Sequence, residues 1–176
     1  MKTCELFKEK TTLSFEVFPP KSSTPVESIY STISQLQPLN PDFISVTYGA
    51  GGSTNNATID ICSAIKNHHK IESVAHLPCL YQTKERVLEQ LEEMKSANIE
   101  NRGDRNPDFE PAGDFHYASD LVSFIKEHSD MNVIGACYPE CHPECNSIVD
   151  DIKHLKDKVD AGCSQLITQL FFDNST

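Results

Sequence analysis

The fold is decided by the stretch LSFEVFPPKSSTPVESIYSTISQLQPLNPDFISVTY, residues 13–48. The apolar run at 13–18 predicts a β-strand, which the prolines at 19 and 20 end because proline has no N–H to give to a sheet. Apolar residues at helical spacing over 22–36 predict a helix, and residues 42–48 predict a second strand. This order of strand, helix and strand indicates two parallel strands joined by a helical crossover.

The same alternation continues along the chain and predicts an α/β fold. We expect a helix that begins near residue 54 and runs past 65, a strand at 72–79, a helix at 83–94, a helix at 120–128, a strand at 131–138, a helix at 147–161 and a strand at 165–172. Two architectures fit this order, a doubly wound open sheet and a (β/α)8 barrel. The 176 residues are too few for a complete barrel, which normally takes about 250.

Composition excludes several classes of protein. The net charge is −11, which argues against nonspecific binding to nucleic acid or to an anionic membrane surface. No apolar run approaches the roughly 18 residues of a membrane span, and the polar residues 1–12 do not resemble a secretory signal. Seven cysteines, an odd number, indicate reduced thiols in the cytoplasm rather than a disulfide framework.

Polar residues gather where the predicted strands end. These are Glu16, Thr47 with Tyr48, His76, Tyr138 and Gln169. In both candidate architectures, binding sites lie at the carboxyl ends of the strands. The sequence has neither a G-x-G-x-x-G nor a Walker motif, so any nucleotide is held by other means.

Seven short motifs in a fixed order resemble the methylenetetrahydrofolate reductase family. They are SFEVFPPK at 14–21, SVTYGAGG at 45–52, AHLPC at 75–79, RGD at 102–104, YASDL at 117–121, YPECHPE at 138–144 and ITQLFFD at 167–173. The resemblance implies a flavin-containing TIM barrel, an enzyme that reduces 5,10-methylenetetrahydrofolate to 5-methyltetrahydrofolate with NADH or NADPH through bound FAD. It makes residues 1–176 a single, partial TIM-barrel catalytic domain of about five to six βα units.

Two departures from the family pattern predict an incomplete barrel. The fourth strand is expected to be about four residues short, because Ile99, Glu100 and Asn101 lead directly into Arg102. The sequence ends at Thr176, just after the sixth expected strand, so strands seven and eight are missing. We therefore expect a fragment or a truncated variant.

The resemblance gives Glu16 the role of general acid, which protonates N10 of the folate. Strand alternation places Glu16 on the face opposite Phe15 and Val17, and desolvation inside a barrel is expected to raise the pKa of its carboxyl. Asp104 is implied as a second catalytic residue, which contacts the pterin and stabilises the cationic iminium. Gln169 and Thr47 complete the implied folate site. The alternative for Glu16 is an ordinary strand-end carboxylate.

The family pattern assigns a larger set of residues to FAD: Thr47, Tyr48, Ala50, His76, Arg102, Gly103, Asp104, Tyr117, Ala118, Tyr138, His142, Asp151, His154 and Lys158. The last three share one face of the helix at 147–161, opposite an apolar stripe, and Lys158 would contact the phosphates. A solvated charged face is the alternative. An acid at 157, where the family has arginine or lysine, weakens the phosphate assignment.

Two further readings remain open. A zinc site at Cys137, Cys141, His142 and Cys145 has suitable ligands but not the usual C-x2-C spacing, so we expect no metal. A non-catalytic remnant that binds flavin or folate would need a partner chain to complete the barrel. Homo-oligomerisation and the choice between NADH and NADPH stay undetermined at this stage.

Overall fold

The computed structural model describes residues 1–20, 23–48, 56–79, 82–104 and 113–173. In this part of the chain six strands form one sheet, in the order β1-β2-β3-β4-β5-β6. They are β1 (Ser14–Val17), β2 (Phe43–Val46), β3 (Glu72–Leu77), β4 (Asn101–Asp104), β5 (Asn132–Cys137) and β6 (Gln165–Thr168). Every neighbouring pair is parallel.

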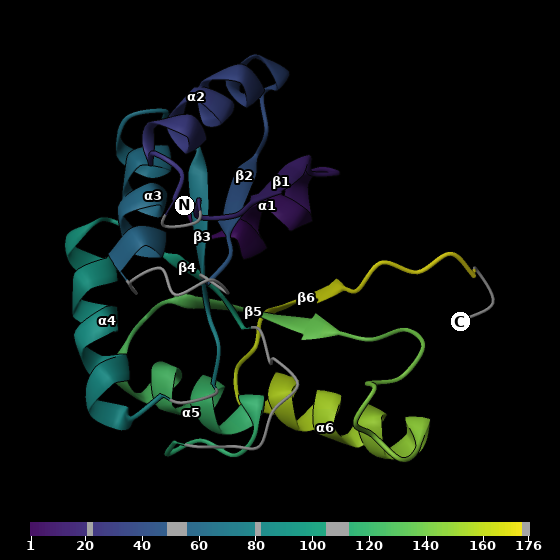
Figure 1. Ribbon diagram of the computed structural model, residues 1–176. Helices are drawn as coiled ribbons and strands as arrows, with labels where there is room; N and C mark the ends of the chain where they lie inside the picture. The colour runs from purple at the N-terminus through teal and green to yellow at the C-terminus, as the bar shows by residue number, and fades with distance from the viewer. Residues whose placement is uncertain (21–22, 49–55, 80–81, 105–112, 174–176) are drawn as a thin grey trace.

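The strand order separates the two candidate architectures. A doubly wound sheet reverses its strand order at a switch point, whereas a barrel adds each new strand beside the preceding one. Here each strand lies beside its predecessor, and the sheet curls in Figure 1. The protein therefore has an incomplete TIM-barrel-like α/β fold, as the sequence predicts.

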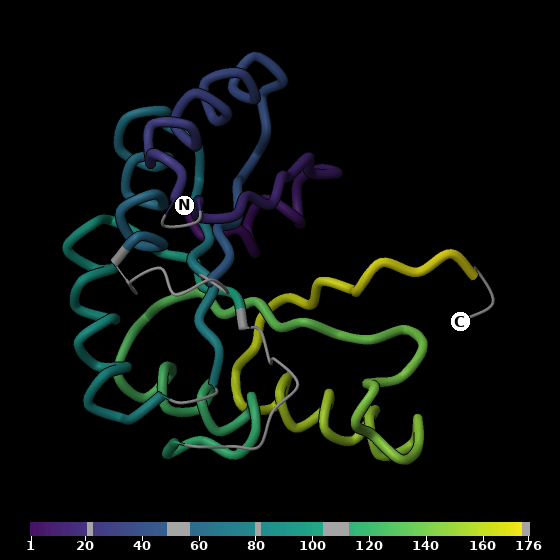
Figure 2. Tube along the Cα trace, viewed as in Figure 1, coloured from purple at the N-terminus to yellow at the C-terminus, as the bar shows by residue number. Residues whose placement is uncertain are grey.

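The helices that alternate with the strands cover one side of the sheet. They are α2 (Glu27–Leu36) with the short 3-10 helix η1 (Gln37–Leu39), α3 (Asn56–Asn67), α4 (Lys84–Ser96), α5 (Ala118–His128) and α6 (Ile148–Asp160). Figure 2 shows the chain passing from each of these helices into the following strand. A further helix, α1 (Thr3–Glu9), lies on the other side of the sheet (Figure 1).

Strand alternation gives the sheet two different faces. The outward side chains, such as Ile44 and Val46, join the large buried cluster under the helices. The concave face has a small apolar cluster of its own, made of Phe43, Val74 and Ile134. Helix α1 covers this concave face, because the ring of Phe7 lies 6.1 Å from that of Phe43.

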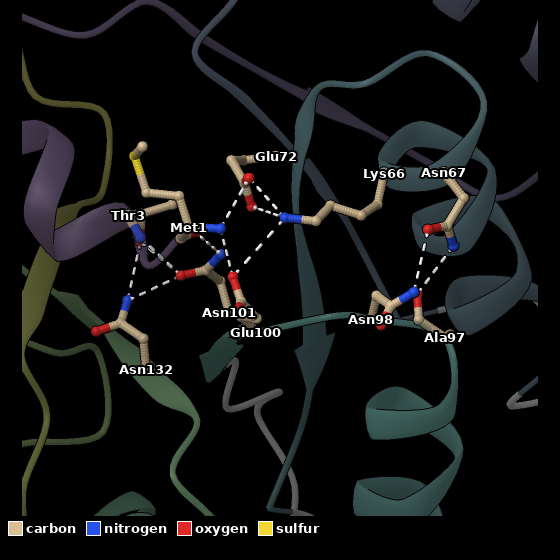
Figure 3. A network of polar contacts seen from close by, with 10 residues as sticks. All are labelled: Met1, Thr3, Lys66, Asn67, Glu72, Ala97, Asn98, Glu100, Asn101 and Asn132. Atoms are coloured by element: carbon tan, nitrogen blue, oxygen red, sulfur yellow. Dashed lines mark hydrogen bonds and ion pairs between the residues drawn. The ribbon is translucent and has the colours of Figure 1, made fainter.

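A polar network joins α1 to the amino ends of β4 and β5 (Figure 3), and it extends to β6 through Gln165. Asn101 Oδ1 accepts hydrogen bonds from the Thr3 N–H at 2.7 Å and from Asn132 Nδ2 at 3.2 Å. The Thr3 hydroxyl also donates to Gln165 Oε1 at 2.6 Å. Beside the network, Lys66 binds the Glu72 carboxylate. The sequence pattern does not predict α1, because a polar seven-residue segment has no long apolar periodicity.

The expected deficit in the fourth strand does not remove the strand. β4 is built from Asn101 and the Arg102-Gly103-Asp104 motif itself, and it pairs with both β3 and β5. At four residues it is as long as β1, β2 and β6. The fourth strand is therefore short, as expected, but it is formed and is fully part of the sheet.

The C-terminal edge of the sheet exposes apolar side chains. Helix α6 has no buried residue, and Ile152, which the sequence places on an apolar stripe, is 58% exposed. After β6, Leu170 and Phe172 are 80% and 86% exposed. The stripe is exposed because β6 is an edge strand, so no further strand or helix of the described chain packs there. No helix among the described residues has the length and apolar character needed to cross a membrane.

Candidate functional site

A cavity of about 810 Å³ opens at the carboxyl end of β5. Its walls come from the start of α5, the end of β5, the loop at 142–146 and one face of α6. This volume lies in the range of small-molecule and cofactor sites. The carboxyl end of a parallel strand is also where binding sites form in barrel enzymes.

Half of the predicted FAD residues line this cavity together. They come from four separate segments of the sequence: Tyr117, Ala118, Tyr138, His142, Asp151, His154 and Lys158. Asp157, the acid noted in the sequence, lines it too. The expectation that Asp151, His154 and Lys158 share one helix face is confirmed.

Two ring pairs flank the cavity. The rings of Tyr117 and His154 have centroids 5.3 Å apart, which joins the start of α5 to α6. The rings of Tyr138 and His142 meet edge to face at 4.5 Å, which joins the end of β5 to the loop after it. Aromatic faces of this kind can stack on a planar heterocycle.

Local capping holds these walls in place. Asp120 Oδ2 accepts hydrogen bonds from the N–H groups of His116 at 3.0 Å and Tyr117 at 2.9 Å, which fixes the start of α5. Ser147 Oγ accepts from the Asp150 N–H at 3.1 Å and caps α6. In the loop between β5 and α6, the His142 N–H donates to Asp151 Oδ2 at 3.0 Å.

The side chain of Lys158 packs directly over Gly135 on its way to the cavity. Its ammonium donates to the Ala136 carbonyl oxygen at 2.9 Å. A Cβ at Gly135 would lie 2.8 Å from both Lys158 Cδ and Cys163 Sγ, closer than carbon contacts allow. Gly135 thus provides the space through which the lysine passes. The sequence analysis missed this residue, although a glycine inside a strand often marks a close approach.

Charge in the cavity is mixed. The carboxylates of Glu144, Asp151 and Asp157 line the same cavity as Lys158. Asp150 also lines the wall, but its hydrogen bonds to Lys153 and to Ser147 lower the pKa of its carboxyl and keep it engaged on α6. Of the remaining carboxylates, that of Asp151 already accepts a hydrogen bond from the His142 N–H. The cavity therefore suits a ligand whose anionic part lies near Lys158 and whose large planar part contacts the rings.

A second group of predicted residues lies on the concave face, at the carboxyl ends of β1, β3 and β4. His76 Nε2 lies 3.6 Å from Glu16 Oε2, and the ring of His76 passes over Gly103, where a Cβ would come within 2.9 Å. The side chain of Glu16 is 46% exposed, so the expected desolvation of its carboxyl is wrong for this structure. The reason is that β1 is an edge strand, so one side of Glu16 stays open.

The other predicted residues lie elsewhere. Thr47 is buried beside β1, with its N–H donating to the Val17 carbonyl at 3.0 Å. Tyr48 turns toward the Gln82 side chain, and burial raises the pKa of its hydroxyl. Arg102 is 1% exposed, and alternation along β4 puts it on the face opposite Gly103.

Three predicted positions remain, and the structure describes them to different extents. Ala50 lies outside the described residues, and only the backbone of Asp104 is described, as the last residue of β4. Gln169 is exposed and lies just beyond β6, although its N–H still donates to the Cys137 carbonyl at 2.8 Å. The structure thus brings Tyr138 into the cavity, while Glu16, His76 and Gln169 share only the same rim of the sheet.

The cysteine-rich loop offers no metal centre. Across the residues that the structure describes, no group of three or more histidine, cysteine, aspartate or glutamate side chains could hold a metal ion. The zinc reading of Cys137, Cys141, His142 and Cys145 therefore gains no support. None of the seven cysteines, all of which lie among the described residues, forms a disulfide.

Comparisons with known proteins agree on one family. The family model described as methylenetetrahydrofolate reductase matches residues 2–176. The 5,10-methylenetetrahydrofolate reductase of Pectobacterium carotovorum is 39% identical over 170 residues, which cover 92% of this chain and 55% of the relative. The enzyme of the same name from Escherichia coli K12 is 38% identical over 165 residues, with the same coverage. The chain spans about half the length of these bacterial relatives.

Solved structures show the same fold at lower identity. A protein from Clostridium thermocellum described as binding two copies of 5-methyl-5,6,7,8-tetrahydrofolic acid matches with a TM-score of 0.66 and 18% identity, over 96% of this chain and 57% of that one. A phosphoenolpyruvate phosphomutase from Streptomyces platensis matches with a TM-score of 0.67 and 12% identity, over 93% of this chain and 61% of that one. Because the family model matches nearly every residue, the chain belongs to the methylenetetrahydrofolate reductase family.

Proposed function

We propose that the chain is the cofactor- and folate-binding part of an enzyme that reduces 5,10-methylenetetrahydrofolate to 5-methyltetrahydrofolate. NADH or NADPH is the reductant and FAD the bound cofactor. The reaction follows from the names of the relatives. Residues 1–176 act as one partial barrel domain in this proposal, and seven cysteines in the thiol form support a cytoplasmic location.

The observation that carries the FAD assignment is the cavity at the end of β5. Seven residues assigned to FAD by the family pattern line it, although they come from segments up to about 40 positions apart, as Tyr117 and Lys158 do. The two ring pairs offer stacking surfaces, and the Lys158 ammonium offers a positive charge for a phosphate. The donor set thus fits a dinucleotide with a planar ring system.

The chain's own residues hold and orient the reactants. When bound, FAD supplies hydride transfer between the nicotinamide and the folate. Tyr117, His154 and Lys158 bind one part of it, while Tyr138 and His142 lie toward the sheet. In this proposal Glu16, on the concave face, gives a proton to N10 of the folate, and His76, whose Nε2 lies 3.6 Å from Glu16 Oε2, returns a proton to it.

An FAD titration of the reduced, folded protein tests this proposal. Lys158→Ala removes a charge-assisted hydrogen bond, worth about 1.5–3 kcal/mol, and should weaken FAD binding about tenfold to a hundredfold. Lys156→Ala is the matched control, because Lys156 lies on the same helix but is exposed and pairs with Asp160. Equal affinities of the two variants, or a wild-type protein that takes up no FAD, would contradict the assignment.

The exposed apolar edge after β6 favours a second candidate function, a binding remnant that needs a partner chain. Leu170 and Phe172 there are 80% and 86% exposed. A remnant would bind flavin only after a partner had covered this edge. Flavin uptake by the isolated chain would therefore exclude the second candidate and leave the first.

A further inference from the structure

The loop between β5 and α6 brings two cysteines together. Two consecutive turns fold the loop, closed by hydrogen bonds from the Cys141 N–H to the Tyr138 carbonyl at 3.3 Å and from the Cys145 N–H to the His142 carbonyl at 2.9 Å. The side chains of Cys141 and Cys145 meet in a hydrogen bond. A pair of thiols in contact can form a disulfide with only local movement of the loop.

The backbone at Cys141 is unusual and must be held by its surroundings. Its φ is 80°, a left-handed conformation that is costly for a residue with a Cβ. The loop is anchored on both sides of this point, by the Cys141–Tyr138 turn and by the hydrogen bond from the His142 N–H to Asp151. The anchored turn keeps the two thiols in contact, and neither of them lies in the packed core.

We propose that Cys141 and Cys145 form a reversible redox pair, which a peroxide or a small disulfide of the glutathione type oxidises to an intramolecular disulfide. With a peroxide, the Cys145 thiolate attacks one oxygen, the O–O bond breaks, and Cys145 becomes a sulfenic acid. The Cys141 thiol then attacks that sulfur, an S–S bond forms and water leaves. In total, the two thiols lose two electrons and two protons. Hydrogen peroxide is reduced to two molecules of water, and an organic peroxide is reduced to an alcohol and one molecule of water.

The two cysteines have different roles in this step. Cys145 lines the cavity, where a small oxidant can reach it. Desolvation, the Asp151 carboxylate and the neighbouring Cys145 raise the pKa of Cys141, which disfavours its thiolate. Because Cys145 is the one that lines the cavity, it is the attacking thiol and Cys141 is the resolving one. Oxidation also breaks the hydrogen bond from Cys145 Sγ to the Ser147 carbonyl, measured at 3.3 Å.

The pair is coupled to the cavity. The same loop carries His142, and Tyr138 begins it, so a disulfide would fix one wall of the cavity. A ligand in the cavity would in turn cover Cys145. This coupling rests on the proposed function, whereas the disulfide itself does not, because it forms in protein free of FAD.

The first test maps the disulfide in FAD-free, full-chain protein. The reduced protein is treated with hydrogen peroxide or oxidised glutathione, free thiols are alkylated, and peptides are identified by mass spectrometry. We expect a Cys141–Cys145 link that dithiothreitol reverses, with the buried Cys62 unmodified as an internal control. Cys137→Ser should keep the link. Cys141→Ser should instead leave Cys145 as a sulfenic acid or a mixed disulfide.

Two outcomes would overturn the proposal. One is a link that uses Cys137 in place of either partner, and the other is full alkylation of both Cys141 and Cys145 after oxidant treatment. A second experiment measures the rate of oxidation with FAD present. At about ten times its Kd, FAD should slow the reaction about tenfold, since only the open fraction reacts. An unchanged rate would overturn the coupling to FAD while leaving the disulfide intact.

Discussion

Gly135→Ala should impair both stability and flavin binding, because the new methyl group occupies the path of Lys158. The added Cβ would lie 2.8 Å from Lys158 Cδ and from Cys163 Sγ, and 3.4 Å from Leu166 Cδ2. Overpacking of this kind typically costs about 1–3 kcal/mol. Replacing glycine with alanine restores about 0.4–1 kcal/mol by restricting the unfolded chain. We therefore expect a net loss of about 1–2 kcal/mol.

Equilibrium unfolding in urea measures this loss. With a slope of about 2 kcal/mol per molar, the midpoint should fall by about 0.5–1 M. A double-mutant cycle with Lys158→Ala identifies the contact responsible, since the alanine at 158 no longer blocks the methyl group. The two changes should couple by more than about 0.5 kcal/mol. A second cycle with Cys163→Ala measures the share of the sulfur contact.

The flavin readout makes the prediction specific to the site. The displaced Lys158 loses its hydrogen bond to the Ala136 carbonyl, so FAD binding to Gly135→Ala should weaken in the same direction as in Lys158→Ala. A Gly135→Ala protein with wild-type stability and wild-type FAD affinity would refute the reasoning. So would strict additivity in both cycles.

Three further predictions concern the concave face and the N-terminal segment. Glu16→Gln should slow reduction of the folate about 100-fold or more while sparing reduction of the flavin by NADH, as followed by flavin absorbance in stopped flow; equal loss in both half-reactions would contradict the acid role. Asn101→Ala leaves the Thr3 N–H without its acceptor and should cost about 1–3 kcal/mol in urea unfolding, whereas Gln35→Ala on the exposed face of α2 should cost under about 0.5 kcal/mol. The hydrogen bonds of Asp42 to Lys10 and to the Leu13 N–H lower the pKa of its carboxyl, so its stabilisation is present at neutral pH and is lost as pH falls through that pKa. Asp42→Asn should therefore be less stable at neutral pH and lose less on acidification, and parallel pH curves would argue against it.

Local sequence pattern predicts most of this fold, because amphipathic helices repeat their apolar residues at helical spacing and buried parallel strands are short, mostly apolar runs. The run at 42–48 is an example, since every residue of β2 (Phe43–Val46) is buried. Helix α1 is different, because Thr3 contributes a hydrogen-bonding side chain rather than an apolar stripe. Its partners lie about 100 positions or more away, as the Thr3–Asn101 bond does, so no local pattern could indicate it.

In the candidate site, too, the sequence predicts some features and not those that depend on contacts between distant residues. Strand order predicts that Tyr138 and Glu16 lie at one rim, because carboxyl ends of parallel strands meet there. It does not predict which residues share a cavity, since that depends on the side-chain path of Lys158 over Gly135. Nor does it predict the exposure of Glu16, which depends on β1 being an edge strand.

The docking of α1 has a consequence for synthesis of the protein on the ribosome. Thr3 and Gln165 form a hydrogen bond across 162 positions. At about 5–20 residues per second, translation takes roughly 8–30 s to cover that distance. A seven-residue helix is not stable alone in water, so α1 stays unfolded during this interval. The segment is thus made long before its last hydrogen-bonding partner, and it completes its native contacts only after that partner has been synthesised.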